Sequence, residues 1–378
     1  MKRFVFALTL AFGFSALAVD GETWRDAKLG YRQKFTFTAA TASCPQFPLA
    51  IVGNATYFKI DKGRMKTGCW AIFDQDGNQW YGEEVSLSDD GAYHTFEFHA
   101  SLSTFDLYTA KTALWLYYDP ANAPTSSQVG ATGSANGKAV WDSSFKGVWH
   151  LTNLTESTGN TGDLTAVNTP TTATGIIGGA YAFDSTKNQS LYVSKAAVTA
   201  SPVTFEGWFN GDTAGDRLIV QVGQDGAGEI WQVVFDGTPQ VYGGIFAGGV
   251  YRKAVKIVAL ASAWHHAAAV FTSTTSRTAY LDGSAGTTAT DTIADPAKAD
   301  KSIIGNDPWW TGYRMNGSLD EIRISDAVRS VDWITSVVAN GPAGNGLTPD
   351  GSGEQTMPAG GYHGYPWPLL NPMKGGHQ

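Results

Sequence analysis

The sequence predicts an all-β protein with two domains, and three observations support this. Short runs of alternating or apolar residues recur along the chain between glycine-containing turns, which is the pattern of strands rather than helices. Charged residues make up only 16% of the chain, which has 44 glycines and 13 tryptophans, a balance typical of sandwiches with tight turns and an aromatic core. A length of 378 residues is long for one core and sufficient for two.

Residues 1–18 have the features of a secretory signal peptide. A basic start is followed by an apolar run from Phe4 to Leu17 and by a small residue, Ala18. The run is too short to span a bilayer, and no later stretch reaches the roughly 20 apolar residues that a membrane helix needs. We therefore expect an exported protein without a membrane-spanning segment, located outside the cell, at its surface or in a periplasm.

Composition divides the remaining chain into four segments. Residues 19–120 carry strand-length runs and are predicted to form the first β domain, whereas residues 121–139 have almost no bulky apolar residue and are predicted to be a flexible linker. The strand pattern resumes in residues 140–340, the predicted second domain. Residues 341–378 are punctuated by Gly and Pro without periodicity, which predicts an irregular tail.

One helical segment is expected near the end of the second domain. From Asp326 to Ala339, apolar residues recur at spacings of three and four, which is the period of a helix with one buried face. Ser325 stands in the position of an N-terminal cap. The second domain is thus expected to be all β except for this one short helix.

Eight short motifs follow one another through the second domain. They are GVWHL from Gly147, ESTGN from Glu156, GGAYAFD from Gly178, VTFEGW from Val203, WHHA from Trp264, AYLDG from Ala279, IG from Ile304 and GSLDEIR from Gly317. In this order they resemble the concanavalin A-like, laminin-G-type domains of secreted bacterial proteins. The resemblance covers about residues 147–340 and implies an antiparallel jelly roll that binds rather than catalyses.

The first domain carries a looser likeness. Its motifs are Trp24 followed by Tyr31-Arg32, the Phe47-Pro48-Leu49 run, Phe73-Asp74 with Asp76-Gly77, and the closing Leu116-Tyr117-Tyr118-Asp119. They resemble the domain of unknown function family 2341, a β domain often found just ahead of a laminin-G-like module. Membership in that family implies no biochemical activity.

The laminin-G resemblance also implies one structural calcium ion at the rim of the sandwich. Asp320 matches the acidic residue before the last strand that usually binds it, and Asn160, Glu156 and Asp184 are candidates for the other oxygen ligands. The sequence does not choose among these three. In the alternative interpretation, Asp320 and Asp184 only accept backbone N–H groups at strand ends.

Alternation along a strand gives expectations for residues near Asp320. Glu321 should point to the opposite face, and Arg323 should point outward as a polar residue between two isoleucines. His265 and His266 lack cysteine or carboxylate partners at metal-binding spacing, so we expect packed or hydrogen-bonded histidines rather than ligands.

Cys44 and Cys69 are the only two cysteines. In an exported protein they predict a disulfide that closes a short loop and contributes about 3 kcal/mol by the chain-entropy model. Two buried free thiols are the alternative. A metal site is not expected, because two thiols without a nearby histidine pair are an incomplete ligand set.

Charge and motifs exclude several classes of function. A net charge of −8 without a cluster of Lys and Arg argues against a nucleic-acid partner. The sequence lacks a Gly-x-Ser-x-Gly elbow, a His-Glu-x-x-His helix, a phosphate-binding loop and the alternating carboxylates of jelly-roll glycosidases. We therefore expect no catalytic residues, and a glycan-active enzyme is the least favoured alternative.

The best candidate for a binding site is an aromatic loop. Trp309 and Trp310 lie between a proline and a glycine and cannot both be core residues by alternation, so at least one should be near the surface, where sugars stack on exposed rings. With Tyr313 and Arg314 they are the predicted ligand-binding residues. The predicted partner is a glycan or a cell-surface protein, and a structural or protein-interaction scaffold of the cell envelope is the alternative function.

Overall fold

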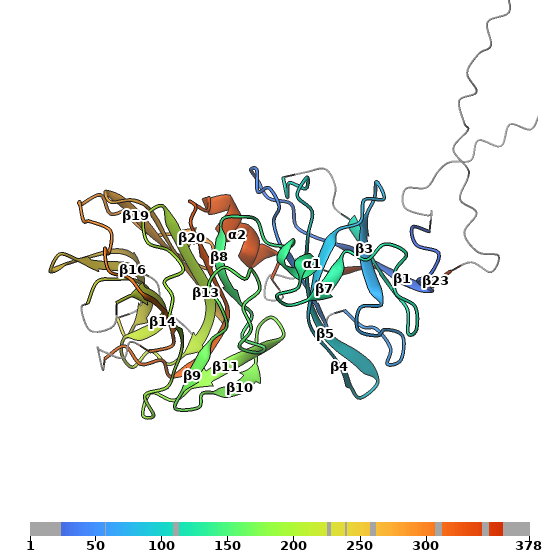
Figure 1. The fold of residues 1–378 in the computed structure, drawn as a ribbon, viewed down its shortest axis with the longest axis horizontal. Coiled ribbons are helices and arrows are strands. Elements are labelled where there is room, and N and C mark those ends of the chain that lie inside the picture. The colour runs from blue at the N-terminus through green and yellow to red at the C-terminus, as the bar shows by residue number, and fades with distance from the viewer. Residues whose placement is uncertain are drawn as a thin grey trace, which may run out of the picture.

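The computed structural model describes residues 24–56, 58–108, 113–224, 228–238, 240–257, 262–306, 312–341 and 348–357. In these residues the fold is nearly all β, with strands in four sheets and two short helices. The sheets form two sandwiches that lie side by side (Figure 1). The predicted fold class is confirmed, whereas the predicted signal peptide, residues 1–18, lies outside the described residues.

The first sandwich consists of two four-stranded sheets, in the orders β23-β1-β6-β3 and β2-β5-β4-β7. The strands are β1 (Tyr31–Thr36), β2 (Leu49–Gly53), β3 (Trp70–Asp74), β4 (Tyr81–Asp90), β5 (Tyr93–Ser101), β6 (Ala113–Tyr118), β7 (Val129–Ala131) and β23 (Thr348–Thr356). On β5, Phe96 and Phe98 belong to the core between the sheets. Because side chains alternate along a strand, Glu97 and His99 point to the outer face of their sheet.

The second sandwich is the jelly roll. Its eight-stranded sheet has the order β10-β11-β22-β13-β18-β19-β20, with β8 also paired to β22, and its seven-stranded sheet has the order β17-β16-β15-β14-β21-β12-β9. The strands are β8 (Phe145–Trp149), β9 (Thr165–Val167), β10 (Thr171–Thr174), β11 (Gly179–Phe183), β12 (Ser190–Val193), β13 (Val203–Gly211), β14 (Arg217–Gly223), β15 (Ile230–Asp236), β16 (Gln240–Ala247), β17 (Val250–Ile257), β18 (His265–Ser273), β19 (Ser276–Leu281), β20 (Ser284–Ala285), β21 (Lys301–Ile304) and β22 (Gly317–Ser325). Buried residues such as Trp149, Phe209 and Trp231 fill the core between these sheets.

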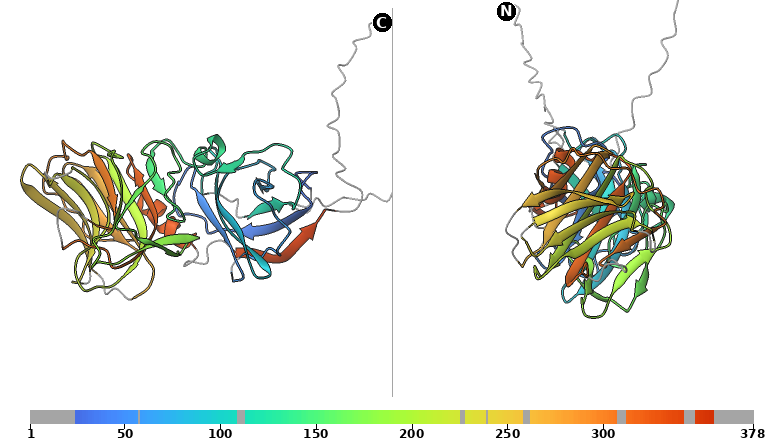
Figure 2. Two further views of the ribbon diagram at one scale, coloured as in Figure 1. Left: turned by 60° about the horizontal axis from the view of Figure 1, so that its bottom comes forward. Right: turned by 90° about the vertical axis from the view of Figure 1, so that its left-hand side faces the viewer.

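The chain returns to the first sandwich at its C-terminal end. Strand β23 pairs antiparallel with β1, beside which Figure 2 shows it. Arg32 donates to Gln355 (2.7 Å), and the Tyr118 hydroxyl donates to Glu354 (2.9 Å). The prediction of an irregular tail over residues 341–378 is therefore wrong for this strand. The error has a physical cause, because a strand held mainly by backbone bonds to a distant sheet edge needs no apolar periodicity.

The predicted flexible linker, residues 121–139, is also structured in part. Strand β7 pairs parallel with β4, and the short helix α1 (Ala135–Lys138) is capped by Ser134, whose hydroxyl accepts from the Gly137 N–H. A Cβ atom at Gly137 would lie 2.6 Å from the carbonyl oxygen of Ala131. The glycine in this segment thus allows a close approach of backbones, which composition alone does not distinguish from flexibility.

The second helix, α2 (Val331–Ala339), is shorter than predicted. It begins after Ser330, whose hydroxyl accepts from the Trp333 N–H at 3.1 Å, so the predicted cap at Ser325 is wrong. The apolar residues Val328 and Val331 contributed to the longer prediction but are 48% and 47% exposed. No helix in the described part of the chain is both long and apolar enough to cross a membrane.

Helix α2 packs between the two sandwiches. The Trp333 ring lies 4.8 Å from Phe47 of the first sandwich and 6.1 Å from Phe145 of the jelly roll, and the Arg329 guanidinium lies 4.0 Å above it. Arg329 also binds both carboxylate oxygens of Asp142, at 2.7 and 3.0 Å. The resulting hydrophobic cluster is continuous with the core of the first sandwich. The two sandwiches therefore share a packed hydrophobic interface around this helix.

The two cysteines are buried free thiols, so the predicted disulfide is wrong. Cys44 precedes β2 and Cys69 precedes β3, and these strands belong to opposite sheets of the first sandwich. The two thiols have different neighbours, Cys44 lying near Asp332 and Asp106 and Cys69 near Lys66, Asp119 and Glu84. Burial, with Asp332 and Asp106 nearby, raises the pKa of the Cys44 thiol to about 11. The alternative of buried thiols is thus the one observed.

Candidate functional site

Two of the four predicted ligand-binding residues lie in the described structure. Trp309 and Trp310 are outside the described residues, whereas Tyr313 and Arg314 are half-buried. Tyr313 lies against the outer face of the seven-stranded jelly-roll sheet and borders a cavity of about 150 Å³. The cavity is lined by Gly228, Ile230, Gln232, Phe246, Tyr251 and Tyr313.

The β16–β17 hairpin positions the aromatic wall of this cavity. Phe246 and Tyr251 are cross-strand partners next to the turn at Gly248 and Gly249, both of which have positive φ. The Tyr251 ring lies over Gly244, where a Cβ atom would be 2.2 Å from the tyrosine hydroxyl oxygen. A glycine at position 244 is therefore needed for the ring to lie flat on the sheet.

Polar groups with unused hydrogen-bonding capacity lie beside these rings. Gln232 donates its amide to the Tyr251 hydroxyl at 3.0 Å, but its Oε1 has no partner among the described residues. Gln221 is opposite Gln232 on the neighbouring strand, and both of its amide atoms also lack partners in the described part of the chain. Burial raises the pKa of Tyr251, so its hydroxyl stays protonated at neutral pH.

Each of the four predicted calcium ligands has hydrogen-bond partners of its own in the described structure. Asp320 is fully buried, and its Oδ2 accepts the N–H groups of Ile176 and Ile177 at 2.8 and 2.9 Å. Glu156 Oε1 accepts the Val148 N–H at 3.0 Å. The two carboxylates therefore have different partners and serve as local backbone acceptors.

The other two candidates are bound in separate turns. Asp184 accepts the Thr186 N–H, and this hydrogen bonding lowers the pKa of Asp184 to about 2. Asn160 donates its amide to the Phe145 carbonyl. The calcium ion itself stays a prediction, but the contacts of Asp320 and Asp184 are those of the alternative interpretation.

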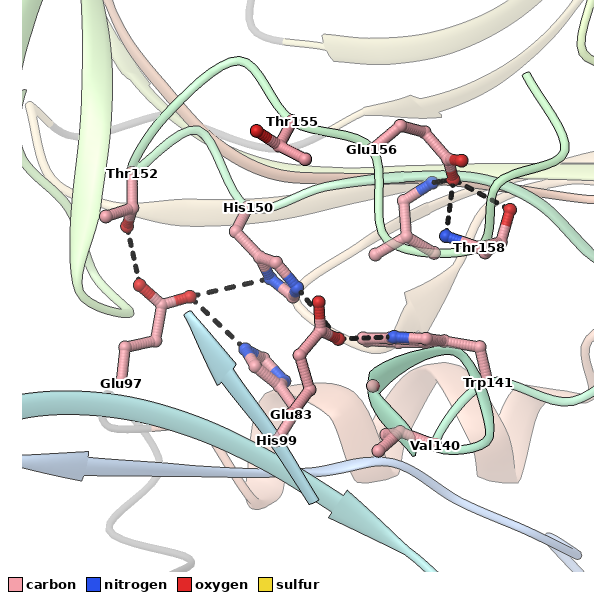
Figure 3. A network of polar contacts seen from close by, with 12 residues as sticks. Glu83, Glu97, His99, Val140, Trp141, His150, Thr152, Thr155, Glu156 and Thr158 are labelled. Carbon is pink, nitrogen blue, oxygen red and sulfur yellow. Dashed lines mark hydrogen bonds and ion pairs between the residues drawn. The ribbon is translucent and has the colours of Figure 1, made fainter. Parts of the chain in front are cut away.

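A different group of ionisable residues meets between the two sandwiches. Glu97 and His99 come from β5, His150 follows β8 directly, and Glu321 lies on β22. Each is at most 2% exposed, and one ligand atom from each lies within 4.8 Å of all the others. We call these four residues the interdomain cluster. Figure 3 shows Glu97 turned toward both imidazole rings, with Glu83 beside His150.

A bulge in β22 directs Glu321 into this cluster. Glu321 has a φ of 49°, and the pairing register between β22 and β13 shifts at this point. Alternation is therefore broken, and the expectation that Glu321 points away from Asp320 is wrong, because both carboxylates are buried on the side facing the first sandwich. Arg323 was expected to point outward, and it does leave the jelly-roll core, but the first sandwich covers it.

In Glu97 and in Glu321, the carboxylate oxygen that does not face the imidazoles is held by a hydrogen bond. Thr152 donates to Glu97 Oε2 at 2.5 Å, and Arg323 Nη2 donates to Glu321 Oε2 at 2.5 Å. A third carboxylate, Glu83, accepts from the Trp141 indole at 2.6 Å (Figure 3). The remaining oxygens, Glu97 Oε1 and Glu321 Oε1, both face the imidazole nitrogens.

Electrostatics make this group a strongly coupled network. Burial alone would lower the pKa of His150, but Glu321 and Glu83 raise it well above its ordinary value. Burial would likewise raise the pKa of Glu321, but His150 and His99 hold it well below the ordinary range. Burial prevails at Glu97, whose pKa is raised. His150 and Glu321 therefore stabilise each other's charged forms.

Sequence reasoning missed this cluster because its members have no motif spacing. They come from three distant segments that meet only when the two sandwiches dock. The available signal was Glu97 and His99, two polar residues at alternate positions of a strand whose other face is aromatic. The interpretation of His265 and His266 as packed or hydrogen-bonded residues agrees with the structure, since His265 Nδ1 lies 2.8 Å from Asp282 Oδ2 and His266 is buried against the Trp208 ring.

Comparisons with known proteins agree with the jelly-roll architecture. Residues 184–335 match the laminin-G family model described as the concanavalin A-like lectin/glucanases superfamily. No curated protein matches the chain. The match covers part of the second domain only, and the likeness of the first domain to the domain of unknown function family 2341 stays a prediction.

Solved structures with a similar fold are distant in sequence. Domain 4 of AbnA, an extracellular arabinanase from Geobacillus stearothermophilus solved with arabinotriose, is 17% identical, with a TM-score of 0.45 over 51% of this chain and 98% of that one. The binding domain of Paraclostridial Mosquitocidal Protein 1 is 12% identical, with a TM-score of 0.42 over 52% of each chain. The Ruminococcus gnavus sialidase module CBM40, solved with a sialyllactose, is 13% identical, with a TM-score of 0.33 over 37% of this chain and 84% of that one. Residues 184–335 of this chain are therefore similar in sequence to the concanavalin A-like superfamily.

Proposed function

We propose that the protein is an exported, non-catalytic glycan-binding protein whose jelly roll holds a sugar in the cavity beside Tyr251 and Tyr313. The observation that carries this proposal is the composition of the cavity wall. Phe246 and the two tyrosines supply rings, and Gln232 supplies a buried amide oxygen without a partner among the described residues.

The chemistry of this wall suits a carbohydrate. The C–H face of a sugar packs on an aromatic ring, while its hydroxyls need both donors and acceptors nearby. Gln232 Oε1 accepts from a sugar hydroxyl, and the protonated Tyr251 hydroxyl donates to one. The cavity volume of about 150 Å³ is below the roughly 300–1,000 Å³ of pockets for drug-sized ligands, which favours one sugar residue of a longer chain.

The same wall argues against catalysis at this place. Hydrolysis of a glycosidic bond uses two carboxyl groups that flank it, and the described lining residues include no Asp or Glu. The carboxylates of the interdomain cluster do lie close together, but each is at most 2% exposed. A glycan cannot reach them while the two sandwiches are docked.

A glycan array probed with the full chain, with and without Ca²⁺, tests the proposal. The tightest-binding glycan is then titrated into Tyr251→Ala and Tyr313→Ala. Each variant should bind about tenfold more weakly or worse, which corresponds to the loss of roughly 1.4 kcal/mol or more from a central aromatic contact. Tyr108→Ala is the matched control, because Tyr108 is 60% exposed and belongs to the first sandwich.

Two results would count against the proposal. An array that is silent in both conditions would favour the scaffold alternative. Equal affinities of the wild type, Tyr251→Ala and Tyr313→Ala would place binding elsewhere on the chain. Trp309→Ala and Trp310→Ala, measured with the same glycan, separately test the prediction made from the sequence.

A further inference from the structure

We propose that the interdomain cluster is a structural binding site for a divalent transition-metal ion, ligated by Glu97, His99, His150 and Glu321, that fastens the two sandwiches together. The four ligand atoms are Glu97 Oε1, His99 Nε2, His150 Nδ1 and Glu321 Oε1.

The spacing of the donor atoms fits a four-coordinate ion. Glu97 Oε1 lies 3.2 Å from His99 Nε2 and 3.5 Å from His150 Nδ1, and His99 Nε2 lies 3.4 Å from Glu321 Oε1. A tetrahedral ion with bonds of about 2.0–2.1 Å places its ligand atoms about 3.3 Å apart. A fourth of the six separations, 2.5 Å between His150 Nδ1 and Glu321 Oε1, is an ion pair that a bound metal would widen by less than about 1 Å. The other two, between the two carboxylate oxygens and between the two ring nitrogens, are at most 4.8 Å, so the ligand atoms would move closer together around an ion.

The donor types select the class of metal. Two imidazole nitrogens with two carboxylate oxygens suit Zn²⁺ and neighbouring transition ions. Ca²⁺ prefers six to eight oxygen ligands, and two of the four donors here are nitrogens. This site is therefore distinct in chemistry from the calcium site predicted around Asp320.

The groups around the cluster support the ligands as the outer sphere of a metal site does. Metal-binding carboxylates are usually hydrogen-bonded through their other oxygen, as Glu97 is by Thr152 and Glu321 is by Arg323. Metal-binding imidazoles usually face a carboxylate on their second nitrogen, and His150 Nε2 lies 3.5 Å from Glu83 Oε2.

Two polar atoms beside the four ligand atoms lack hydrogen-bond partners among the described residues. Glu83 Oε1 is fully buried and has no hydrogen-bond partner in the described part of the chain, and the same is true of His99 Nδ1. The His99 and His150 rings stack with centroids 4.2 Å apart, which brings their ligand nitrogens to the same side of the cluster as the two carboxylates.

Burial indicates a structural ion rather than a catalytic one. All four coordination positions come from protein and each ligand is at most 2% exposed, so no position is open to substrate. Glu97 and His99 belong to the first sandwich, whereas His150 and Glu321 belong to the jelly roll. The complete site therefore exists only in the docked molecule, and metal binding would stabilise docking.

The first experiment uses the full chain without an affinity tag, freed of metal with a chelator. Zn²⁺ alone is titrated in a calorimeter, and the metal content of the chain recovered from Zn²⁺-supplemented medium is measured by mass spectrometry. We expect one tightly bound Zn²⁺ per chain, a higher melting temperature with Zn²⁺ and no such shift with Ca²⁺. A wild-type chain that takes up no Zn²⁺ in either measurement overturns the proposal and leaves the cluster as an ion-pair network.

Variants then locate the bound ion. His99→Gln should weaken Zn²⁺ binding by at least about 100-fold, since even changes to groups behind the ligands cost 10–100-fold. His265→Gln is the matched control, because His265 pairs with Asp282 outside the cluster. Equal loss in both variants, or loss in the control alone, would contradict the assignment. If His99→Gln does not fold, Glu97→Gln replaces it as the test of the ligands, and the wild-type titration still shows whether the chain binds Zn²⁺.

Discussion

Replacing Trp333 with alanine should weaken the contact between the two sandwiches more than any exposed change in the same helix. Trp333 is only 3% exposed and packs against Phe47 of one sandwich and Phe145 of the other. Truncating a buried tryptophan to alanine costs about 3–5 kcal/mol, a large part of the roughly 5–15 kcal/mol that keeps a domain folded. The cap of the helix should persist, because Ser330 accepts from the backbone N–H of residue 333 rather than from the indole.

Urea unfolding followed by circular dichroism measures this effect. In the wild type the continuous hydrophobic cluster should make the sandwiches unfold together, whereas Trp333→Ala should show either a lower midpoint or two separate transitions. Val331→Ala is the control in the same helix, because Val331 is 47% exposed and should change stability by no more than about 0.5 kcal/mol. A loss below about 1 kcal/mol in Trp333→Ala would refute the claim that this side chain joins the sandwiches.

Three further measurements check other parts of the structure. Burial, and after it the charge of Arg323, lowers the pKa of His266 from 6.5 to about 3 in the folded state. Between these two pH values the unfolded state binds a proton that the folded state does not bind. The free energy of unfolding should therefore decrease as the pH drops below 6.5, by about 2 kcal/mol at pH 5. The urea midpoint, measured against pH, tests this. If a His266→Gln variant shows the same pH dependence as the wild type, His266 is not the cause. Ser330→Ala should lower the melting temperature through the loss of about 1 kcal/mol of capping energy, and an unchanged transition would argue against the observed start of α2. Titration of thiols in the denatured chain without reductant should find two, from Cys44 and Cys69, and a count of zero would restore the disulfide.

The fold class could be predicted because it depends on local signals. Alternation of apolar residues and the turns between them define strands, and the ordered motifs from Gly147 to Arg323 identify the jelly roll. Ser330 shows the limit of such signals at the boundary of an element. Its neighbours repeat with helical period on both sides, so the sequence alone did not show which serine caps the helix.

The interface between the sandwiches could not be predicted because it depends on long-range contacts. Strand β23 is recognisable only from its partner β1, more than 300 residues earlier in the chain. Glu321 enters the interdomain cluster through a bulge, which the rule of alternation does not anticipate. Arg323 follows the rule, because its side chain points out of the jelly-roll core. Docking of the two sandwiches then decides whether this outer face is exposed to solvent or covered by the other domain.

The candidate sugar site could be predicted in part. Tyr313 was predicted from its place in an aromatic loop, whereas Tyr251 was not among the predicted ligand-binding residues. The structure places both at one cavity, because the β16–β17 hairpin carries Tyr251 over Gly244 to the edge where Tyr313 lies. Gln232 was not foreseen, because its place beside Tyr251 and the missing partner of its Oε1 depend on the assembled sheet.

A crystal structure of the full chain with the tightest-binding array glycan tests the central claim most directly. The proposed function predicts a sugar ring packed between Tyr251 and Tyr313, with one hydroxyl hydrogen-bonded to Gln232 Oε1. A glycan bound on another face of the jelly roll, or on the first sandwich, would contradict it.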